Sequence, residues 1–287
     1  DAYEAVIDAG FDHLPDLPAS GKIQAIMDEV ANNNVPMTVQ PTVYLSNVSQ
    51  DVTEVGLQGN YHDGINFNNL DSDVDLLLEG SYDKYVGNAV GHVNAYYARP
   101  GATADITIAP EEGNVLQGEP ILVNWLYLGN VSTANFTLEG HEGVVFDGIW
   151  GDDHGDSVLE ALNFAGDGYF EIESVLPGSL TSVDASGAVD FTAELEGALP
   201  GEGLTFTAAQ GVTELTLDSV TAGFHSSFSA EEDADFTLVI QGNTDISAAT
   251  LTNVDTMYLD DGATVKLSMA QIDTLGQANI VLAHPGY

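Results

Sequence analysis

The spacing of apolar side chains changes near residue 35. Before that point, the i, i+3, i+4, i+7 spacing of an amphipathic helix occurs at Ile23, Ile26, Met27 and Val30. Ser20 is a suitable N-cap for this helix. We therefore expect a small N-terminal helical segment within residues 1–34.

After residue 35, apolar and polar side chains alternate with the period of two that half-buried strands require. Gly, Asp and Asn cluster between the alternating runs, as at residues 59–64 and in a predicted hairpin turn at residues 260–262. The predicted strands are residues 38–40, 42–45, 52–57, 74–78, 102–108, 121–128, 135–138, 144–146, 170–172, 189–195, 204–206, 212–217, 236–240, 256–259 and 264–267. The sequence therefore predicts a mainly β fold, either a short-strand β-solenoid or a β-sandwich.

Composition changes near residues 110–119, where proline, glycine and glutamate flank a short polar stretch. We take this stretch as a boundary or a long loop. The resulting division is a helical segment over 1–34, a first β region over 35–115 and a second β region over 116–287.

A short phrase recurs in the second β region, with two intervening residues between two aliphatic ones. It begins at Leu159, Leu180, Val212 and Leu251, and Val52 begins a possible copy in the first half. The starts are irregularly spaced, whereas solenoids keep tighter periods. The phrases indicate either a degenerate repeat or a pattern that any β-rich chain with many Thr and Val residues would show.

Acidic residues outnumber basic ones by 45 to 4, which gives a net charge of −41. Such a chain repels nucleic acids and anionic membrane surfaces, and it has no apolar run long enough to span a membrane, so we expect neither as a partner. Salt bridges cannot balance these carboxylates, so divalent cations or high ionic strength must do so. Calcium is the natural ion for carboxylate and carbonyl oxygens.

Two carboxylate clusters are the candidate calcium sites. Asp152, Asp153 and Asp156 lie within six residues that also contain two glycines, which let backbone carbonyls turn toward an ion. The second cluster is Asp71, Asp73 and Asp75, which would share one face of a strand. For each cluster, a solvated acidic turn is the alternative interpretation.

The phrases at residues 180–187, 251–259 and 267–272 resemble the Thr-, Ala-, Gly- and Asp-rich regions of bacterial type I-secreted surface proteins, the S-layer and RTX-associated proteins. The resemblance covers about residues 159–276. It implies an extracellular location, calcium dependence, self-assembly and a short helix at residues 267–272. The chain lacks the glycine-aspartate nonapeptide repeats of that family, so a calcium β-roll is not expected.

Three Asn-x-Ser/Thr sequons begin at Asn47, Asn130 and Asn135. In an archaeal or eukaryotic secreted chain they would be glycan sites, whereas in a bacterial chain they usually carry no meaning.

No nucleophile elbow or phosphate-binding loop occurs in the chain, and we do not expect an enzyme. The absence of cysteine, the many short strands and the few charges expected within them favour an extracellular structural subunit that self-assembles through β-strand pairing, as in an S-layer, sheath or filament. Residues 236–240 form either a central strand or a donated edge. One alternative is an adhesin or carbohydrate-binding module, for which Trp125, Tyr127 and Trp150 would bind cell-surface polysaccharide. Another is a non-catalytic domain of a secreted enzyme.

Overall fold

The computed structural model describes residues 42–44, 52–58, 61–83, 87–113, 115–116, 118–151, 159–223 and 225–282. Its fold is mainly β, as the alternating pattern predicts, and it divides into two compact units, Asp1–Val158 and Leu159–Tyr287. The helical segment expected within residues 1–34 lies outside the described residues. Residues 111–113, 115–116 and 118–120, where the composition changes, belong to the connection between two strands of the first unit.

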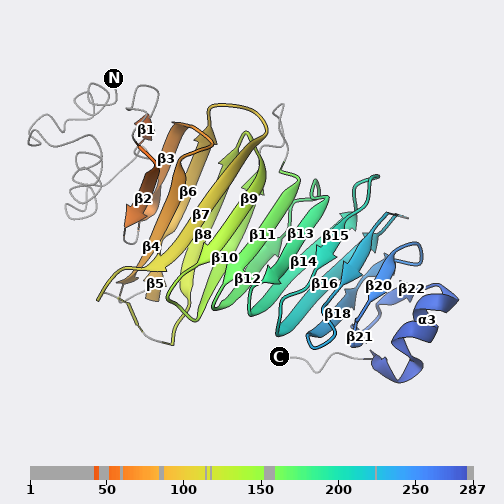
Figure 1. Ribbon diagram of the computed structural model, residues 1–287. Helices are drawn as coiled ribbons and strands as arrows, with labels where there is room; N and C mark the ends of the chain where they lie inside the picture. The colour runs from red at the N-terminus through yellow and green to blue at the C-terminus, as the bar shows by residue number, and fades with distance from the viewer. Residues whose placement is uncertain are drawn as a thin grey trace, which may run out of the picture. The chain divides into compact units, whose positions relative to one another are not determined.

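The strands of the first unit belong to two parallel ladders (Figure 1). One ladder contains β1 (Thr42–Tyr44), β3 (Tyr61–Leu70), β6 (Gly91–Tyr97), β8 (Ile121–Gly129) and β10 (Gly143–Gly151). The other contains β2 (Glu54–Gln58), β4 (Asp75–Asp83), β7 (Ala102–Pro110) and β9 (Val131–Leu138). The short β5 (Gly87–Ala89) pairs antiparallel with the end of β4 and parallel with β8.

The second unit repeats this arrangement. One ladder, here called ladder A, contains β12 (Tyr169–Val175), β14 (Asp190–Ala198), β16 (Val212–Thr221), β18 (Asp235–Gln241), β21 (Thr256–Leu259) and β23 (Ile280–Leu282). The other, ladder B, contains β11 (Ala161–Gly166), β13 (Ser182–Gly187), β15 (Thr205–Thr207), β17 (Ser227–Ser229) and β20 (Thr250–Thr252). The short β19 (Asn243–Asp245) pairs with β16 and with β22 (Thr264–Lys266).

Each unit is a β-solenoid, because, apart from the short strands β5, β19, β22 and β23, strands that follow one another along the chain belong to opposite ladders and pair with their counterparts one turn later. In ladder B, Ala161 lies opposite Ser182, and the register continues through Thr205, Ser227 and Thr250. The steps are therefore 21, 23, 22 and 23 residues. This one-turn period explains how parallel strands form without crossover helices.

The recurring phrases only partly follow this period. The phrases at Leu159 and Leu180 are one turn apart, and Leu162 lies opposite Val183. The phrase at Val212 begins in β16 of ladder A, whereas the one at Leu251 begins in β20 of ladder B. The irregular spacing arises because strands of both ladders share the same alternation.

Phenylalanine fills the core of the second unit. Phe191 contacts Phe164 and Phe206 at ring-centroid distances of 4.9 and 5.9 Å, and Phe206 contacts Phe228 and Phe236 at 6.5 and 5.6 Å. These rings are almost completely buried. Because equivalent strands stack in register, one large apolar residue per strand builds a continuous core.

Two local predictions are corrected, and one open alternative is decided. Residues 61–64 were predicted as a turn but begin β3, where Gly64 with a φ of 80° accompanies a register shift in the pairing with β6. Residues 260–262 do form a turn, but the adjoining strands do not pair with each other, so it is not a hairpin. Residues 236–240 lie in β18, which pairs with β16 and β21, so they form a central strand and not a donated edge.

A short helix, α3 (Met269–Leu275), follows β22 at the C-terminal end of the second unit and overlaps residues 267–272, where the resemblance implies a helix (Figure 1). No described helix is long and apolar enough to cross a membrane.

Candidate functional site

Exposed aromatic side chains gather on the outer face of β6, β8 and β10 in the first unit. Trp125 and Trp150 each expose 42% of their surface, and Tyr96 exposes 39%. Large aromatic rings are normally buried, so several exposed rings on one face indicate a binding surface rather than core packing.

The alternation of each strand aims these rings outward. In β6, Gly91, Val93, Ala95 and Tyr97 face the core, so His92, Asn94 and Tyr96 face away from it. In β8, Leu126 and Leu128 are buried on either side of Tyr127, while Trp125 precedes them on the exposed side. In β10, buried Ile149 precedes exposed Trp150.

The rings form two groups on these three strands. The His92 and Trp125 rings lie 6.4 Å apart with an interplanar angle of 9°, and the Trp125 and Trp150 rings lie 5.7 Å apart at 16°. Tyr96 and Tyr127 lie 5.3 Å apart at 46°. We call His92, Tyr96, Trp125, Tyr127 and Trp150 the aromatic surface.

A glycine leaves room for one of these rings. Gly129 lies opposite Tyr96 in the β6–β8 pairing. A Cβ at Gly129 would lie 2.6 Å from Cδ1 of Tyr96, closer than two carbon atoms can approach. The Tyr96 ring therefore occupies the space above Gly129. Because Gly129 has no side chain, the Tyr96 ring can approach the ring of Tyr127.

Amide side chains continue the outer face beside the rings. Asn94 donates to the side-chain oxygen of Asn66 at 2.7 Å, and Asn66 donates to the hydroxyl of Thr42 at 3.2 Å. In the register, Asn94 lies opposite Tyr127 and Tyr127 lies opposite Trp150. One row across the face thus passes from hydroxyl and amide groups to aromatic rings.

Asp147 adds a carboxyl group in β10, and burial raises its pKa above the usual value while His92 partly opposes the shift. The combination of flat aromatic surfaces, amides and a carboxyl group can stack against an apolar face of a ligand and hydrogen-bond its polar edge.

The calcium site stays a prediction, because only one of its two carboxylate clusters lies within the described residues. Asp71, Asp73 and Asp75 are all exposed around the tight turn that leads into β4, and Asp71 accepts a hydrogen bond from the backbone of Ser72. No group of three or more metal-ligating side chains occurs among the described residues. Asp152, Asp153 and Asp156 lie outside those residues.

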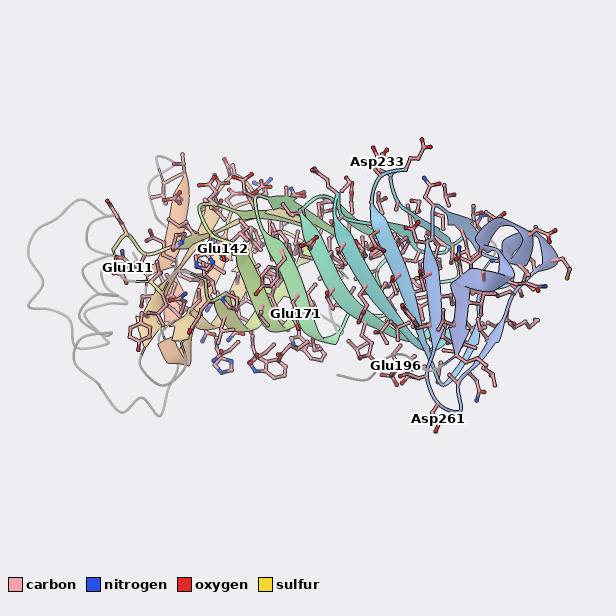
Figure 2. All side chains as sticks on the ribbon, turned by 90° about the horizontal axis from the view of Figure 1, so that it is seen from below. Glu111, Glu142, Glu171, Glu196, Asp233 and Asp261 are labelled. Carbon is pink, nitrogen blue, oxygen red and sulfur yellow. The ribbon has the colours of Figure 1, made fainter. Side chains whose placement is uncertain are left out.

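Carboxylates instead line the outer face of ladder A in the second unit. Burial raises the pKa of Glu194, and the nearby carboxylates of Asp218 and Glu196 raise it further. Glu196 lies directly opposite Asp218 in the β14–β16 pairing. Figure 2 labels Glu171 and Glu196 on neighbouring strands of this ladder. The strands therefore carry more charge than we expected from the sequence.

Two of the sequon asparagines are engaged in the fold. Asn130 has a φ of 64° and donates to the backbone oxygen of Tyr97 at 2.8 Å, while Asn135 donates to Asp105 at 2.6 Å. Asn47 lies outside the described residues.

Comparisons with protein-family models, with curated proteins and with solved structures find no match. The arrangement of the residues in the aromatic surface is therefore the evidence for the candidate site.

Trp125, Tyr127 and Trp150 were candidates from the sequence alone, whereas His92 and Tyr96 were not. The alternation Gly-His-Val-Asn-Ala-Tyr-Tyr over residues 91–97 is a strand signal with aromatic residues on its polar side, and it could have revealed both. That they lie beside the tryptophans follows only from the register of β6 against β8.

Proposed function

We propose that this chain is an extracellular carbohydrate-binding protein of the adhesin type, which holds a glycan on the aromatic surface of its first unit. The observation that carries the proposal is the stack of His92, Trp125 and Trp150, whose rings cross three adjacent strands and remain accessible.

The chemistry of the surface fits a sugar chain. Sugar rings have apolar C–H faces that pack on aromatic rings, and their hydroxyl groups require donors and acceptors at the margin. The rings of Trp125 and Trp150 supply the packing surface, while Asn66, Asn94 and Asp147 supply polar groups on β3, β6 and β10 of the same ladder.

Charge narrows the class of glycan. The net charge of −41 repels acidic polysaccharides, and the chain has four basic residues with which to bind them. A neutral polysaccharide therefore fits the surface better than a uronic-acid or sulfated one.

The proposal is tested by co-sedimentation with insoluble neutral polysaccharides and by a glycan array. Trp125→Ala and Trp150→Ala should each weaken binding about 30-fold or more, since a central aromatic contributes about 2 kcal/mol or more at such a surface. Tyr82→Ala is the matched control, because Tyr82 is 42% exposed on β4 of the same unit but outside the aromatic surface. If both tryptophan variants bind as the wild type does, the aromatic surface is not the binding site.

A second candidate is the self-assembling structural subunit, with calcium or salt screening its charge. It is favoured by β23, which among the described residues pairs on one side only, with β21, and exposes 78% of Leu282. Such an edge can pair with a strand of another copy. Sedimentation velocity across a calcium and sodium chloride series should then reveal polymers, and Leu282→Lys should prevent them. A monomer under every condition would eliminate this candidate.

A further inference from the structure

The outer face of ladder B in the second unit carries an ordered array of small polar side chains. One row across the ladder consists of Ala161, Ser182, Thr205, Ser227 and Thr250. A parallel row, two residues further along each strand, consists of Asn163, Asp184, Thr207, Ser229 and Thr252. All positions except Ala161, Asn163 and Asp184 carry a hydroxyl group. We call these two rows the hydroxyl face.

Buried residues between the two rows hold the array in place. In β15, Phe206 is fully buried between Thr205 and Thr207, and in β17, Phe228 is fully buried between Ser227 and Ser229. Because side chains alternate along a strand, the flanking hydroxyl residues must project outward. From β13 to β20 the register continues without a shift, so the rows are straight.

This geometry fixes the spacing of the hydroxyl groups. Neighbouring strands lie about 4.8 Å apart, and residues two apart along a strand lie about 6.7 Å apart. The hydroxyl face is therefore a nearly rectangular lattice with these two repeats. Rows of oxygen atoms in ice repeat at spacings close to both values, so water bound to this face can match a crystal plane of ice.

Charge distinguishes this face from the rest of the unit. The outer face of ladder A, on the other side of the core, carries Glu171, Glu194, Glu196, Glu214 and Asp218. The two rows of the hydroxyl face carry one carboxylate, Asp184, whose oxygen accepts the backbone N–H of Ser186. In a chain with a net charge of −41, an almost uncharged face excludes a partner that is held by ion pairs.

The size of the side chains on the hydroxyl face further limits which kinds of partner it can bind. The rows contain no aromatic ring against which a sugar could stack, and Thr205, Thr207, Thr250 and Thr252 each place a methyl group beside a hydroxyl. Hydroxyl groups hydrogen-bond water, whereas methyl groups leave neighbouring waters to bond one another. Together they favour ordered water over a bound chain.

We propose that the hydroxyl face binds the surface of ice. Lattice waters hydrogen-bond the serine and threonine hydroxyls, and the threonine methyl groups lie between them. This site uses a different unit and different residues from the aromatic surface, so it does not depend on the proposed carbohydrate binding.

The test measures adsorption of the fluorescently labelled full chain to a growing ice hemisphere and inhibition of ice recrystallisation. We expect the wild type to enter the ice and to slow recrystallisation. Thr205→Tyr should reduce the activity at least tenfold, because a bulky ring lifts the lattice away from the face. Thr192→Tyr is the matched control, since Thr192 is equally an exposed strand threonine but lies on the outer face of ladder A.

Thr250→Lys, at an exposed position on the last strand of ladder B, is a second variant that places a charge on the face with little effect on packing. Circular dichroism and thermal unfolding identify any variant that fails to fold. Exclusion of the wild type from ice would overturn the proposal, as would equal activity of the folded Thr250→Lys variant and the wild type. Binding to crystalline cellulose or chitin that Thr250→Lys abolishes, without binding to ice, would also contradict it.

Discussion

Glu194 illustrates how single carboxylates limit the stability of this chain. Its pKa is raised by burial and by the carboxylates of Asp218 and Glu196. A carboxyl group whose folded-state pKa is raised binds its proton more tightly in the folded state than in the unfolded state. The destabilisation that the ionised Glu194 causes is therefore absent at pH values below the pKa of the unfolded state. It develops as the pH rises from that pKa through the raised pKa of the folded state.

The first prediction is that Glu194→Gln stabilises the protein at pH 7 by about 0.5 kcal/mol, since partial burial and the nearby carboxylates of Asp218 and Glu196 disfavour the charged form of Glu194, while solvent screens part of the effect. At pH 3.5 the variant and the wild type should unfold alike. Urea unfolding at both pH values provides the measurement, with exposed Glu232→Gln as the control. A gain that is equal at the two pH values would contradict this account.

Thr213 has a different role, as a buried hydroxyl within the phenylalanine core. It lies between Phe191 and Phe236 in the register of ladder A, and its hydroxyl accepts the backbone N–H of Ala209 at 2.9 Å. Valine has the same shape but cannot accept this bond, so a buried donor would lose its partner.

We therefore predict that Thr213→Val destabilises the protein by about 1 to 3 kcal/mol. Thr216→Val, on the outer side of the same strand, is the control and should change the unfolding free energy by less than about 0.5 kcal/mol. Equal effects in chemical unfolding would indicate that the hydroxyl of Thr213 is not structurally important.

At the scale of residues, sequence predicted which side chains are aromatic or acidic but not which of them meet. Trp125 and Trp150 could be named as candidates from their type. Their contact with each other and with His92 depends on the register between strands more than 20 residues apart, which local patterns do not encode.

Among the elements, α3 closes the C-terminal end of the second unit. Ser268 caps the helix, and Gln271 donates from its side chain to the backbone oxygens of Ile246 and Ala249 at 2.7 and 2.9 Å. These carbonyls follow β19 and precede β20, so one buried glutamine links the helix to the last turns of the solenoid. Terminal caps of this kind cover the core that a further turn would otherwise bury.

We expect Gln271→Ala to destabilise the C-terminal turn by about 1 to 3 kcal/mol, because two buried carbonyls lose their donor. Hydrogen exchange should become faster in β21 and β23, while β12 and β14 remain protected. Gln277→Ala, at an exposed position after the helix, is the control. Uniform loss of protection across the second unit would contradict a local role for the cap.

Element prediction succeeded where alternation was uninterrupted and failed where glycine or short length concealed it. The predicted run at 256–259 coincides with β21 (Thr256–Leu259). The sequence missed β6, whose core-facing positions include Gly91 and Ala95, too small to give a strong apolar signal. The three-residue strand β17 was also missed, because its alternation is too short to stand out without its pairing with β15 and β20.

For the whole molecule, the net charge of −41 sets the response to salt. We predict that the thermal unfolding midpoint rises between about 0.01 M and 0.15 M sodium chloride, as the Debye length falls from roughly 30 Å to roughly 8 Å. Calcium at equal ionic strength should raise the midpoint further if Asp152, Asp153 and Asp156 bind it, and a chelator should then reverse the gain. A midpoint independent of both salts would contradict charge repulsion as a limit on stability.

The mainly β class was predictable from the whole chain because the period of two persists after residue 35. The sequence did not distinguish a β-solenoid from a β-sandwich, since the strands of both folds show the same alternation of apolar and polar residues. What distinguishes them is pairing between equivalent strands one turn apart, and the connecting turns differ in length enough to conceal the 21 to 23 residue period of ladder B.

The most direct test of carbohydrate binding uses the protein's own fluorescence. The chain contains two tryptophans, Trp125 and Trp150, and both belong to the aromatic surface, so tryptophan emission reports on this surface alone. Titration with a soluble neutral oligosaccharide that the array identifies should shift and saturate the emission, and Asn94→Ala should weaken the apparent affinity. If a glycan binds the protein while the tryptophan emission remains unchanged, the binding site lies elsewhere and the account is wrong.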